Sequence, residues 1–464
     1  MQRIANKTFE ELKLGDAASI VRTLTPKDIQ VFATMSGDVN PAHVDEAFAK
    51  SDIFHKVVAH GMWGASLIST VLGTELPGPG TIYLDQSLQF RRPVGLGDTV
   101  TVTVKVIKKL EEKRRVTLEC RVVNQKGEEA ITGTAEVIAP TEKISRPAIE
   151  LPEIELREKG RRYRQLIELT KGLEPIKTAV VHPTDTVSLL GAVEAARANL
   201  IVPVLVGPEH EIRAAAEQAQ LDLSPYEIVA AEHSDAAAKA AVALIRSGEA
   251  EALMKGALHT DELMHAVVEP EKGLRTKRRI SHVFAIDAPG YPRPLFVTDA
   301  AINIYPTLAD KHDIVQNAID LVHALGIAEP RVAILSAVET VTESIRSTLD
   351  AAALCKMADR GQITGGILDG PLAFDNAVSA EAANTKGIVS PVAGNADIFV
   401  VPDLEAGNML AKQLEYLAEA EVAGIVLGAR VPIILTSRAD KTLARLASCA
   451  IALLLARHQM GDKS

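Results

Sequence analysis

The segment Thr99–Ile107, "TVTVTVKVI", alternates strictly between polar and apolar residues. Successive side chains of a strand point to opposite faces, so the four valines at its even positions share one face. Residues 115–123 ("RVTLECRVV") and 130–138 ("AITGTAEVI") repeat this alternation between turn signals. The three segments predict an antiparallel meander with one buried face.

An apolar segment precedes the meander. Gly61–Leu72, "GMWGASLISTVL", is the one strong helix that the sequence predicts in the first half of the chain. A sheet with an apolar face needs a cover, and a curved sheet wrapped around this helix buries both elements. We therefore expect residues 1–140 to form an α+β domain.

The second part of the chain has a different pattern. Residues 141–165 are rich in charge and proline, and they predict a linker leading into an entry helix. From residue 166 to 464, short apolar strands alternate with alanine-rich helices. The predicted strands are "IKTAVVH", "VPVLVG", "EALMKG", "RVAILS", "ADIFVVP", "GIVLG" and "VPIILT". This order predicts an α/β domain with a parallel sheet covered on both faces, whose ligands bind at the carboxyl ends of strands.

Length, composition and charge limit the number of domains and exclude several classes of function. At about 150 residues per domain, 464 residues suggest two or three domains. The formal net charge of −10 argues against a nucleic-acid partner, because phosphate binding needs a basic face. No segment reaches the ~20 uncharged residues of a membrane span, and the N-terminus has no apolar signal core, so we expect a cytoplasmic protein with no membrane partner. The three cysteines lie far apart, and we expect neither a metal nor a covalently bound cofactor.

The stretch 36–45, "SGDVNPAHVD", places Asp38 and His43 on either side of a rigid Asn-Pro turn. Adding water across a conjugated double bond needs a base for the water and an acid for the adjacent carbon, and two such side chains supply both. The developing enolate oxygen also needs donors, which the amides at the start of the helix at Gly61 offer. The alternative is a simple turn in which the aspartate caps the following residues.

The wider sequence "FATMSGDVNPAHVDEAFAKSDIFHKVVAHGMW" and the later "LPGPGTIYLDQSLQFRRPVGLGDTV" resemble the MaoC-like hot-dog proteins, the (R)-specific enoyl-CoA hydratases. The resemblance covers about residues 10–138. It implies that Asp38 and His43 activate water and protonate the α-carbon, with the Gly61 amide in the oxyanion hole and Ser36 and Asn40 orienting the pair.

Two further histidines lie close to this motif in the sequence. We interpret His55 as a loop residue and His60 as a helix-entry residue, and we do not assign either to catalysis.

A second site is predicted near the other end of the chain. The segment 431–456 runs from an apolar strand through "SRAD" into a long apolar helix. Ser437 and Asp440 suit a helix N-terminus as cap and first-turn acid. Arg438 does not, because a cation there is misplaced unless an anion joins it. Helix amides and a guanidinium together predict a phosphate site.

The second half resembles the phosphate acetyl/butyryltransferase family, with the butyryl-type members closest. The matching stretches are "LMKGALHTDELMHAVV", "GLRTKRRISHVFAI", "GGILDGPLAFDNAVSAEAA", "KGIVSPVAGNADIFVVPDLEAGNML" and "GARVPIILTSRAD". The resemblance implies a two-lobed α/β fold and exchange of CoA for phosphate on an acyl group. It implies that Arg438 binds phosphate, that Ser437 lies near the thiol, and that Arg275 and Lys255 bind phosphate or CoA.

The position of the base is a departure from the acetyl-type pattern. That pattern has its proposed base seven residues after the serine, where this chain has Ala444, whereas butyryl-type sequences show the equivalent of Asp440. The run Lys277–Arg279 is interpreted as a solvated face or as a contact to CoA phosphates.

We therefore expect a bifunctional enzyme whose substrates are enoyl-CoA or acyl-CoA and phosphate. Two alternatives stay open. In one, the transferase-like half is a CoA-sensing assembly module; in the other, the hot-dog half is a binding scaffold without turnover. By resemblance, both halves pair with copies of themselves, so we expect a homo-oligomer.

Overall fold

The computed structural model describes residues 3–149, 154, 156, 159–435 and 441–461. Contacts between residues divide the chain into two compact units, residues 1–157 and 158–464. Each unit is described by itself.

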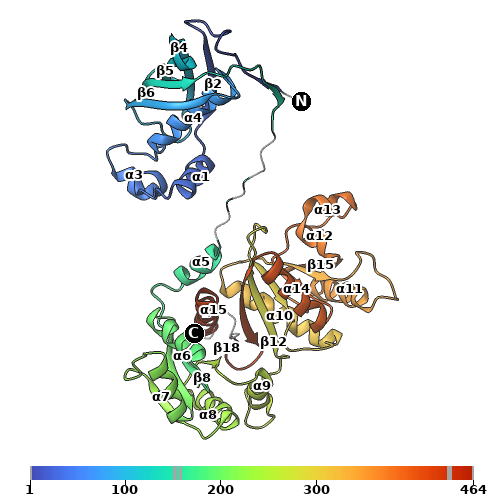
Figure 1. The fold of residues 1–464 in the computed structure, drawn as a ribbon. Helices are drawn as coiled ribbons and strands as arrows, with labels where there is room; N and C mark the ends of the chain where they lie inside the picture. The colour runs from blue at the N-terminus through green and yellow to red at the C-terminus, as the bar shows by residue number, and fades with distance from the viewer. Residues whose placement is uncertain (1–2, 150–153, 155, 157–158, 436–440, 462–464) are drawn as a thin grey trace. The chain divides into compact units, whose positions relative to one another are not determined.

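The first unit combines a five-stranded antiparallel sheet, a short two-stranded ribbon and several helices (Figure 1). Its elements are β1 (Arg3–Ala5), β2 (Ala17–Thr23), α1 (Pro26–Ser36), α2 (Pro41–Val44), α3 (Glu46–Ser51), α4 (Gly61–Thr74), β3 (Ile82–Phe90), β4 (Thr99–Leu110), the 3₁₀ turn η1 (Glu112–Arg114), β5 (Arg115–Asn124), β6 (Glu129–Ile138) and β7 (Ser145–Pro147).

The sheet has the strand order β2-β4-β5-β6-β3, and α4 packs against its apolar face. The valines of β4 at positions 100–106 are fully buried, as are Leu118 and Cys120 of β5. Helix α4 buries Trp63 and Ile68 in the same core. The predicted meander, its buried face and the covering helix are confirmed, and the fold of this unit is a hot-dog.

The prediction of a single strong helix in the first half is wrong. A second helix, α1 (Pro26–Ser36), precedes α4 and was not predicted, and a capping box closes its first turn. The Thr25 side chain accepts from the Asp28 amide, while the Asp28 carboxylate accepts from the Thr25 amide. Two reciprocal bonds satisfy amides that a helix start otherwise leaves free.

The second unit is built on one eleven-stranded sheet. Its elements are α5 (Arg161–Leu169), β8 (Ile176–Val181), α6 (Thr186–Arg197), β9 (Ile201–Gly207), α7 (Glu209–Gln218), β10 (Glu227–Ala230), α8 (Ser234–Ser247), β11 (Ala252–Lys255), α9 (Thr260–Val268), β12 (Ser281–Asp287), β13 (Leu295–Thr298), α10 (Leu308–Ala324), β14 (Arg331–Leu335), α11 (Arg346–Asp359), β15 (Ile367–Leu372), α12 (Phe374–Val378), α13 (Ala380–Thr385), β16 (Ile398–Val400), α14 (Leu404–Leu417), β17 (Glu421–Leu427), β18 (Ile433–Ile434) and α15 (Thr442–Gly461).

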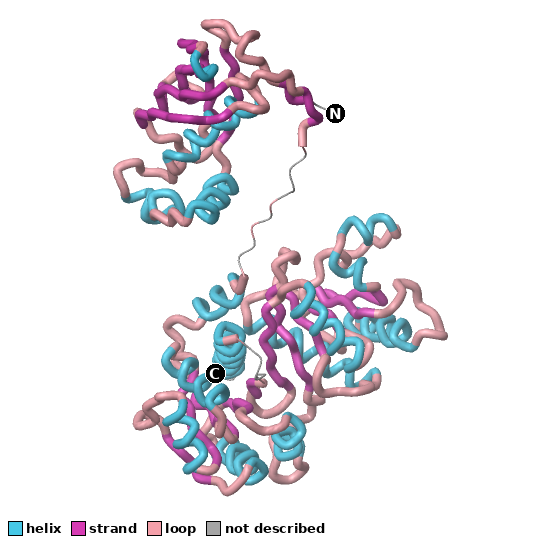
Figure 2. The backbone as a smooth tube through the Cα atoms, in the orientation of Figure 1, coloured by secondary structure: helices cyan, strands magenta, loops and turns pink. Residues whose placement is uncertain are grey.

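The sheet is mixed, which corrects the expectation of a purely parallel one. Its order is β10-β9-β8-β11-β18-β17-β12-β13-β16-β14-β15, and β12 pairs antiparallel with both of its neighbours. The connections 288–294 and 428–432 are too short for a crossover helix, so the strands that they join run antiparallel. Helices lie on both sides of the strands, as predicted (Figure 2).

Regular structure extends into the segment that the sequence predicts as a linker. Strand β7 pairs with β1, which ties residues 145–147 to the first unit. In the second unit, α5 buries Tyr163, whose hydroxyl donates to the carbonyls of Ala285 and Glu421. Residues 145–147 and 161–169 therefore belong to the two folded units.

Truncating one buried side chain of α4 tests the packing of this helix against the sheet. Ile68 is fully buried, so Ile68→Ala should lower the free energy of unfolding by about 3 kcal/mol through lost burial and a residual cavity. Trp63 is the single tryptophan of the chain and lies on the same helix, so its fluorescence during urea unfolding reports on this unit. Ser69→Ala, exposed on α4, should change the value by less than about 0.5 kcal/mol. Equal effects of the two substitutions would contradict the packing described.

Candidate active sites

The turn between α1 and α2 is held by its own polar side chains. Helix α1 ends at Gly37, which takes a left-handed conformation. Ser36 Oγ donates to the Phe32 carbonyl and accepts from the Asp38 amide. Asp38 Oδ1 accepts from the Asn40 amide at 3.1 Å, and Asn40 Oδ1 caps α2. One carboxylate oxygen of Asp38 therefore serves the turn, as the alternative interpretation requires, and the side chain remains exposed.

Two histidines pack beside this turn. The Nδ1 atom of His43 lies 2.8 Å from the Val58 carbonyl oxygen, and Nε2 of His60 lies 3.0 Å from the backbone carbonyl oxygen of Asp38. The ring centroids of His43 and His60 are 4.1 Å apart, and the Phe32 ring lies 5.0 Å from that of His60. The structure thus brings the predicted pair Asp38 and His43 together and adds His60.

Side-chain atoms of Asp38, His43 and His60 lie within 4.8 Å of one another. His60 is buried at the N-cap of α4, so its interpretation as a helix-entry residue agrees with its place in the fold. Its contact with Asp38 was not predicted, because residues 38 and 60 approach only after α4 packs into the sheet. The one signal in the sequence is that His60 immediately precedes the predicted oxyanion residue Gly61.

A pocket of about 370 Å³ opens at the start of α4 and is lined by His43, His60, Gly61, Phe90 and Ile131 among others. Gly61 begins the helix, where backbone amides have no intrahelical acceptor, and His60 makes no side-chain capping bond to them. A Cβ atom on residue 61 would lie 3.2 Å from the Phe90 ring. Glycine therefore keeps the pocket open beside the free amides.

The second predicted site is described only in part. Ser437, Arg438 and Asp440 lie outside the described residues. Strand β18 pairs parallel with β11, and Met254 is opposite Ile434 in the register. Lys255 consequently lies at the same sheet edge as Leu435, which directly precedes the undescribed residues. Lys255 Nζ donates to the carbonyls of Gly256 and Leu258.

Arg275 lies at the other end of β18. It forms an isolated antiparallel bridge with Ala429, in the connection between β17 and β18, and its side chain is exposed. The register therefore places Arg275 and Lys255 beside opposite ends of this short strand.

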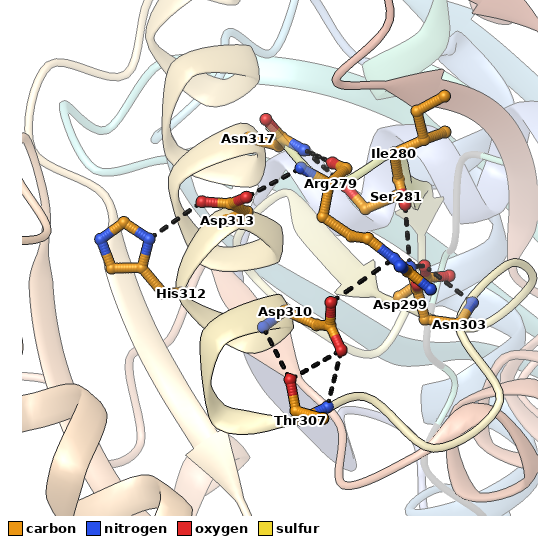
Figure 3. Close-up of polar contacts among 10 residues, drawn as sticks. All are labelled: Arg279, Ile280, Ser281, Asp299, Asn303, Thr307, Asp310, His312, Asp313 and Asn317. Carbon is orange, nitrogen blue, oxygen red and sulfur yellow. Dashed lines mark hydrogen bonds and ion pairs between the residues drawn. The ribbon is translucent and has the colours of Figure 1, made fainter. Parts of the chain in front are cut away.

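The two arginines of the basic run that follows Arg275 have partners within the same unit. Arg278 forms an ion pair with Asp320 of α10. Arg279 Nε donates to Asn303 Oδ1 at 2.7 Å and lies 3.6 Å from Asp310, and its backbone amide donates to Asp313 (Figure 3). Both arginines thus bind acidic or amide groups of the same unit.

A buried carboxylate completes this network. Asp299 accepts three backbone amides and Asn303 Nδ2, and burial raises its pKa above the usual range against the effect of these donors. Asn317 binds the Arg279 carbonyl and Ser281 Oγ (Figure 3). The network fixes the start of β12 to α10 and to the turn after β13.

Comparison with known proteins identifies both halves. Residues 229–453 match the family "Phosphate acetyl/butaryl transferase", and residues 15–128 match the family "MaoC like domain". The phosphate acetyltransferase of Rhizobium meliloti is 64% identical over 295 residues, which are 64% of this chain and 93% of that protein. The chain belongs to the phosphate acetyl/butyryl transferase family.

Within this family, the prediction of greatest similarity to butyryl-type members is wrong. The phosphate butyryltransferase of Clostridium beijerinckii is 43% identical over 64% of this chain and 98% of that protein, well below the acetyltransferase above. Among solved structures, a branched-chain phosphotransacylase from Enterococcus faecalis V583 is 29% identical. It covers 61% of this chain and 99% of its own, with a TM-score of 0.54.

The transferase unit also contains a fully buried histidine. His282 lies on β12, packs edge-on against Phe284, and its Nδ1 atom has no hydrogen-bond partner among the described residues. Burial lowers the pKa of His282 to about 3. Separately, none of the described helices is long and apolar enough to cross a membrane.

His282 should make the transferase unit sensitive to acid. The unfolded chain binds a proton here near pH 6.5, whereas the folded chain does so only near pH 3. The contribution of neutral His282 to the free energy of unfolding is therefore fully present above about pH 6.5. Below that pH, the free energy of unfolding falls by about 1.4 kcal/mol for each pH unit. His282→Leu should flatten this slope. The measurement is hydrogen exchange of the β12 amides in urea, which reports the free energy of unfolding at pH values between 6.5 and 5. The exposed control His210→Leu should keep the wild-type slope, and an unchanged slope in His282→Leu would contradict the assignment.

Proposed function

We propose that the chain is a bifunctional enzyme acting on CoA thioesters. The first unit adds water to a short trans-2-enoyl-CoA to give an (R)-3-hydroxyacyl-CoA. The second exchanges the CoA of an acyl-CoA for inorganic phosphate to give an acyl phosphate and free CoA. The hydratase is supported by the closeness of Asp38 to His43 and by the pocket that His43 and Gly61 line, and the transferase is supported by membership of its family.

The tautomer of His43 favours general acid–base catalysis at the hydratase site. A carbonyl oxygen only accepts, so Nδ1 of His43 carries a hydrogen toward Val58 and Nε2 of a neutral ring holds a lone pair. With the Asp38 carboxylate, this lone pair can take a proton from water as the oxygen bonds to the β-carbon. The same pair then delivers a proton to the α-carbon, while the Gly61 amide donates to the thioester oxygen that carries the enolate charge.

At the transferase site, a phosphate oxygen attacks the thioester carbonyl and the thiolate of CoA leaves. In our proposal Arg438 neutralises the phosphate and Ser437 donates to the departing sulfur. Lys255, beside Leu435, adds positive charge at the same sheet edge.

A second candidate function for this half is CoA sensing without turnover. The observation that favours it is Ala444, at the position of the acetyl-type base, which is buried in α15. Phosphate-dependent release of CoA from acetyl-CoA by the wild-type chain would exclude it.

Asp38→Asn tests the hydratase. Hydration of crotonyl-CoA, followed as loss of the enoyl absorbance, should fall about 10²–10⁴-fold because the amide cannot accept the proton. Phosphate-dependent CoA release by the same sample should keep the wild-type rate, which controls for folding of the chain. Retained hydration in this variant would remove Asp38 from the site.

Ser437→Ala is the reciprocal test, in which transfer should be lost and hydration retained. CoA release from acetyl-CoA and phosphate should fall about 10²-fold or more, as when one donor to a developing charge is removed. Hydration of crotonyl-CoA should stay at the wild-type rate. Equal transfer rates in variant and wild type would contradict the role given to Ser437.

A further inference from the structure

The hydratase site brings together one carboxylate and two imidazole rings, and each neutral ring keeps one nitrogen that can donate an electron pair. His43 donates from Nδ1 to the Val58 carbonyl, which leaves the lone pair of a neutral ring on Nε2. His60 has the opposite tautomer, because its Nε2 donates to the Asp38 carbonyl, which leaves the lone pair on Nδ1. Asp38 adds a carboxylate, and the three side chains meet within 4.8 Å.

His60 provides an independent sign that this cluster holds a ligand. The side chain is only 2% exposed, and its Nδ1 atom has no hydrogen-bond partner among the described residues. A buried polar atom without a partner costs about 1–3 kcal/mol, so such atoms are rare unless something fills the position. His60 Nδ1 thus keeps a lone pair that no described residue uses.

The surroundings match those of metal ligands in proteins. A histidine that binds a metal typically donates its other N–H to a backbone carbonyl, and both rings do so here. A ligating carboxylate is typically hydrogen-bonded in turn, and Asp38 Oδ1 accepts from the Asn40 amide, which leaves Oδ2 for a metal. Two arginines line the same pocket, and each binds another side chain: Arg92 lies 3.5 Å from Glu128, and Arg91 donates to Gln89.

We propose that Asp38, His43 and His60 form a binding site for a divalent transition-metal ion of the zinc class, and that the bound ion inhibits hydration. Two imidazole nitrogens and one carboxylate oxygen are ligands that zinc accepts, with the pocket supplying water as the fourth. The ion occupies the lone pairs that the reaction needs, so binding and turnover exclude each other. Inhibition rests on the proposed hydratase, whereas metal binding does not.

The test compares His60→Gln with His55→Gln in the full chain. Glutamine at position 60 can still donate to the Asp38 carbonyl but has no imidazole lone pair. His55 is exposed on the neighbouring loop and lies outside the cluster, so its variant is the matched control. Equilibrium dialysis against micromolar ZnCl₂ gives the affinity and stoichiometry, and crotonyl-CoA hydration with and without ZnCl₂ gives the inhibition.

The wild type and His55→Gln should bind one zinc ion per chain at this site and lose hydration, which EDTA restores. His60→Gln should bind it at least about 10-fold more weakly and should resist inhibition by the same factor. If Trp63 fluorescence shows that His60→Gln is unfolded, Asp38→Asn should show the same loss of zinc affinity.

Three results would overturn the proposal: no zinc bound by the wild type at micromolar ZnCl₂, equal affinities in wild type and His60→Gln, or hydration that continues at full rate with this site occupied. Zinc bound at the site in a chain that never hydrates crotonyl-CoA would instead support the metal site and refute the proposed hydratase.

Discussion

The proposed hydratase site depends on the hydrogen bond of 3.0 Å from His60 Nε2 to the carbonyl of Asp38. Burial of α4 in the curved sheet fixes His60 and Gly61 at one end of the helix. The bond then joins the turn 36–40 to that end, and the contact of His43 with Val58 holds the other imidazole. Apolar burial thereby determines where Asp38 and His43, the proposed acid–base pair, lie relative to the amides at the start of α4.

The second unit uses a different constraint, the antiparallel strand β17. It separates β18 from β12, so the sheet continues from one set of parallel strands to the other without a break. The short connection 428–432 sets the start of β18, and its parallel pairing with β11 brings Lys255 beside Leu435. On the other side, the network of Arg279, Asp299 and Asn303 fixes the start of β12 (Figure 3).

Local patterns predicted those elements whose burial follows a simple period. Strand β4 alternates over its whole apolar part, and α4 is mostly apolar, so both were predicted close to their observed bounds. Helix α1 was missed because its stability comes from a capping box and not from a wide apolar face. Strands β12 and β13 were missed because their antiparallel pairing depends on a proline-rich connection and on neighbours far away in the sequence.

The residues of the candidate sites also fall into two groups: those close together in the sequence, whose proximity was predicted, and those brought together only by tertiary packing. Asp38 and His43 are near neighbours in the sequence and flank one turn, so their proximity could be predicted. His60 joins them only through packing of α4, and the pairing of Arg278 and Arg279 with residues of α10 and the turn before it depends on the tertiary fold. No pattern of charge along the chain distinguishes such paired arginines from solvated ones.

The most direct test of the account is a crystal structure of the full chain with butyryl-CoA, a saturated thioester that cannot be hydrated. The account predicts that the acyl group enters the pocket lined by His43 and Phe90, with its thioester oxygen about 3 Å from the Gly61 amide and its α- and β-carbons facing Asp38 and His43. An acyl group bound in the first unit away from Gly61, or a pocket that excludes the thioester at saturating butyryl-CoA, would contradict it.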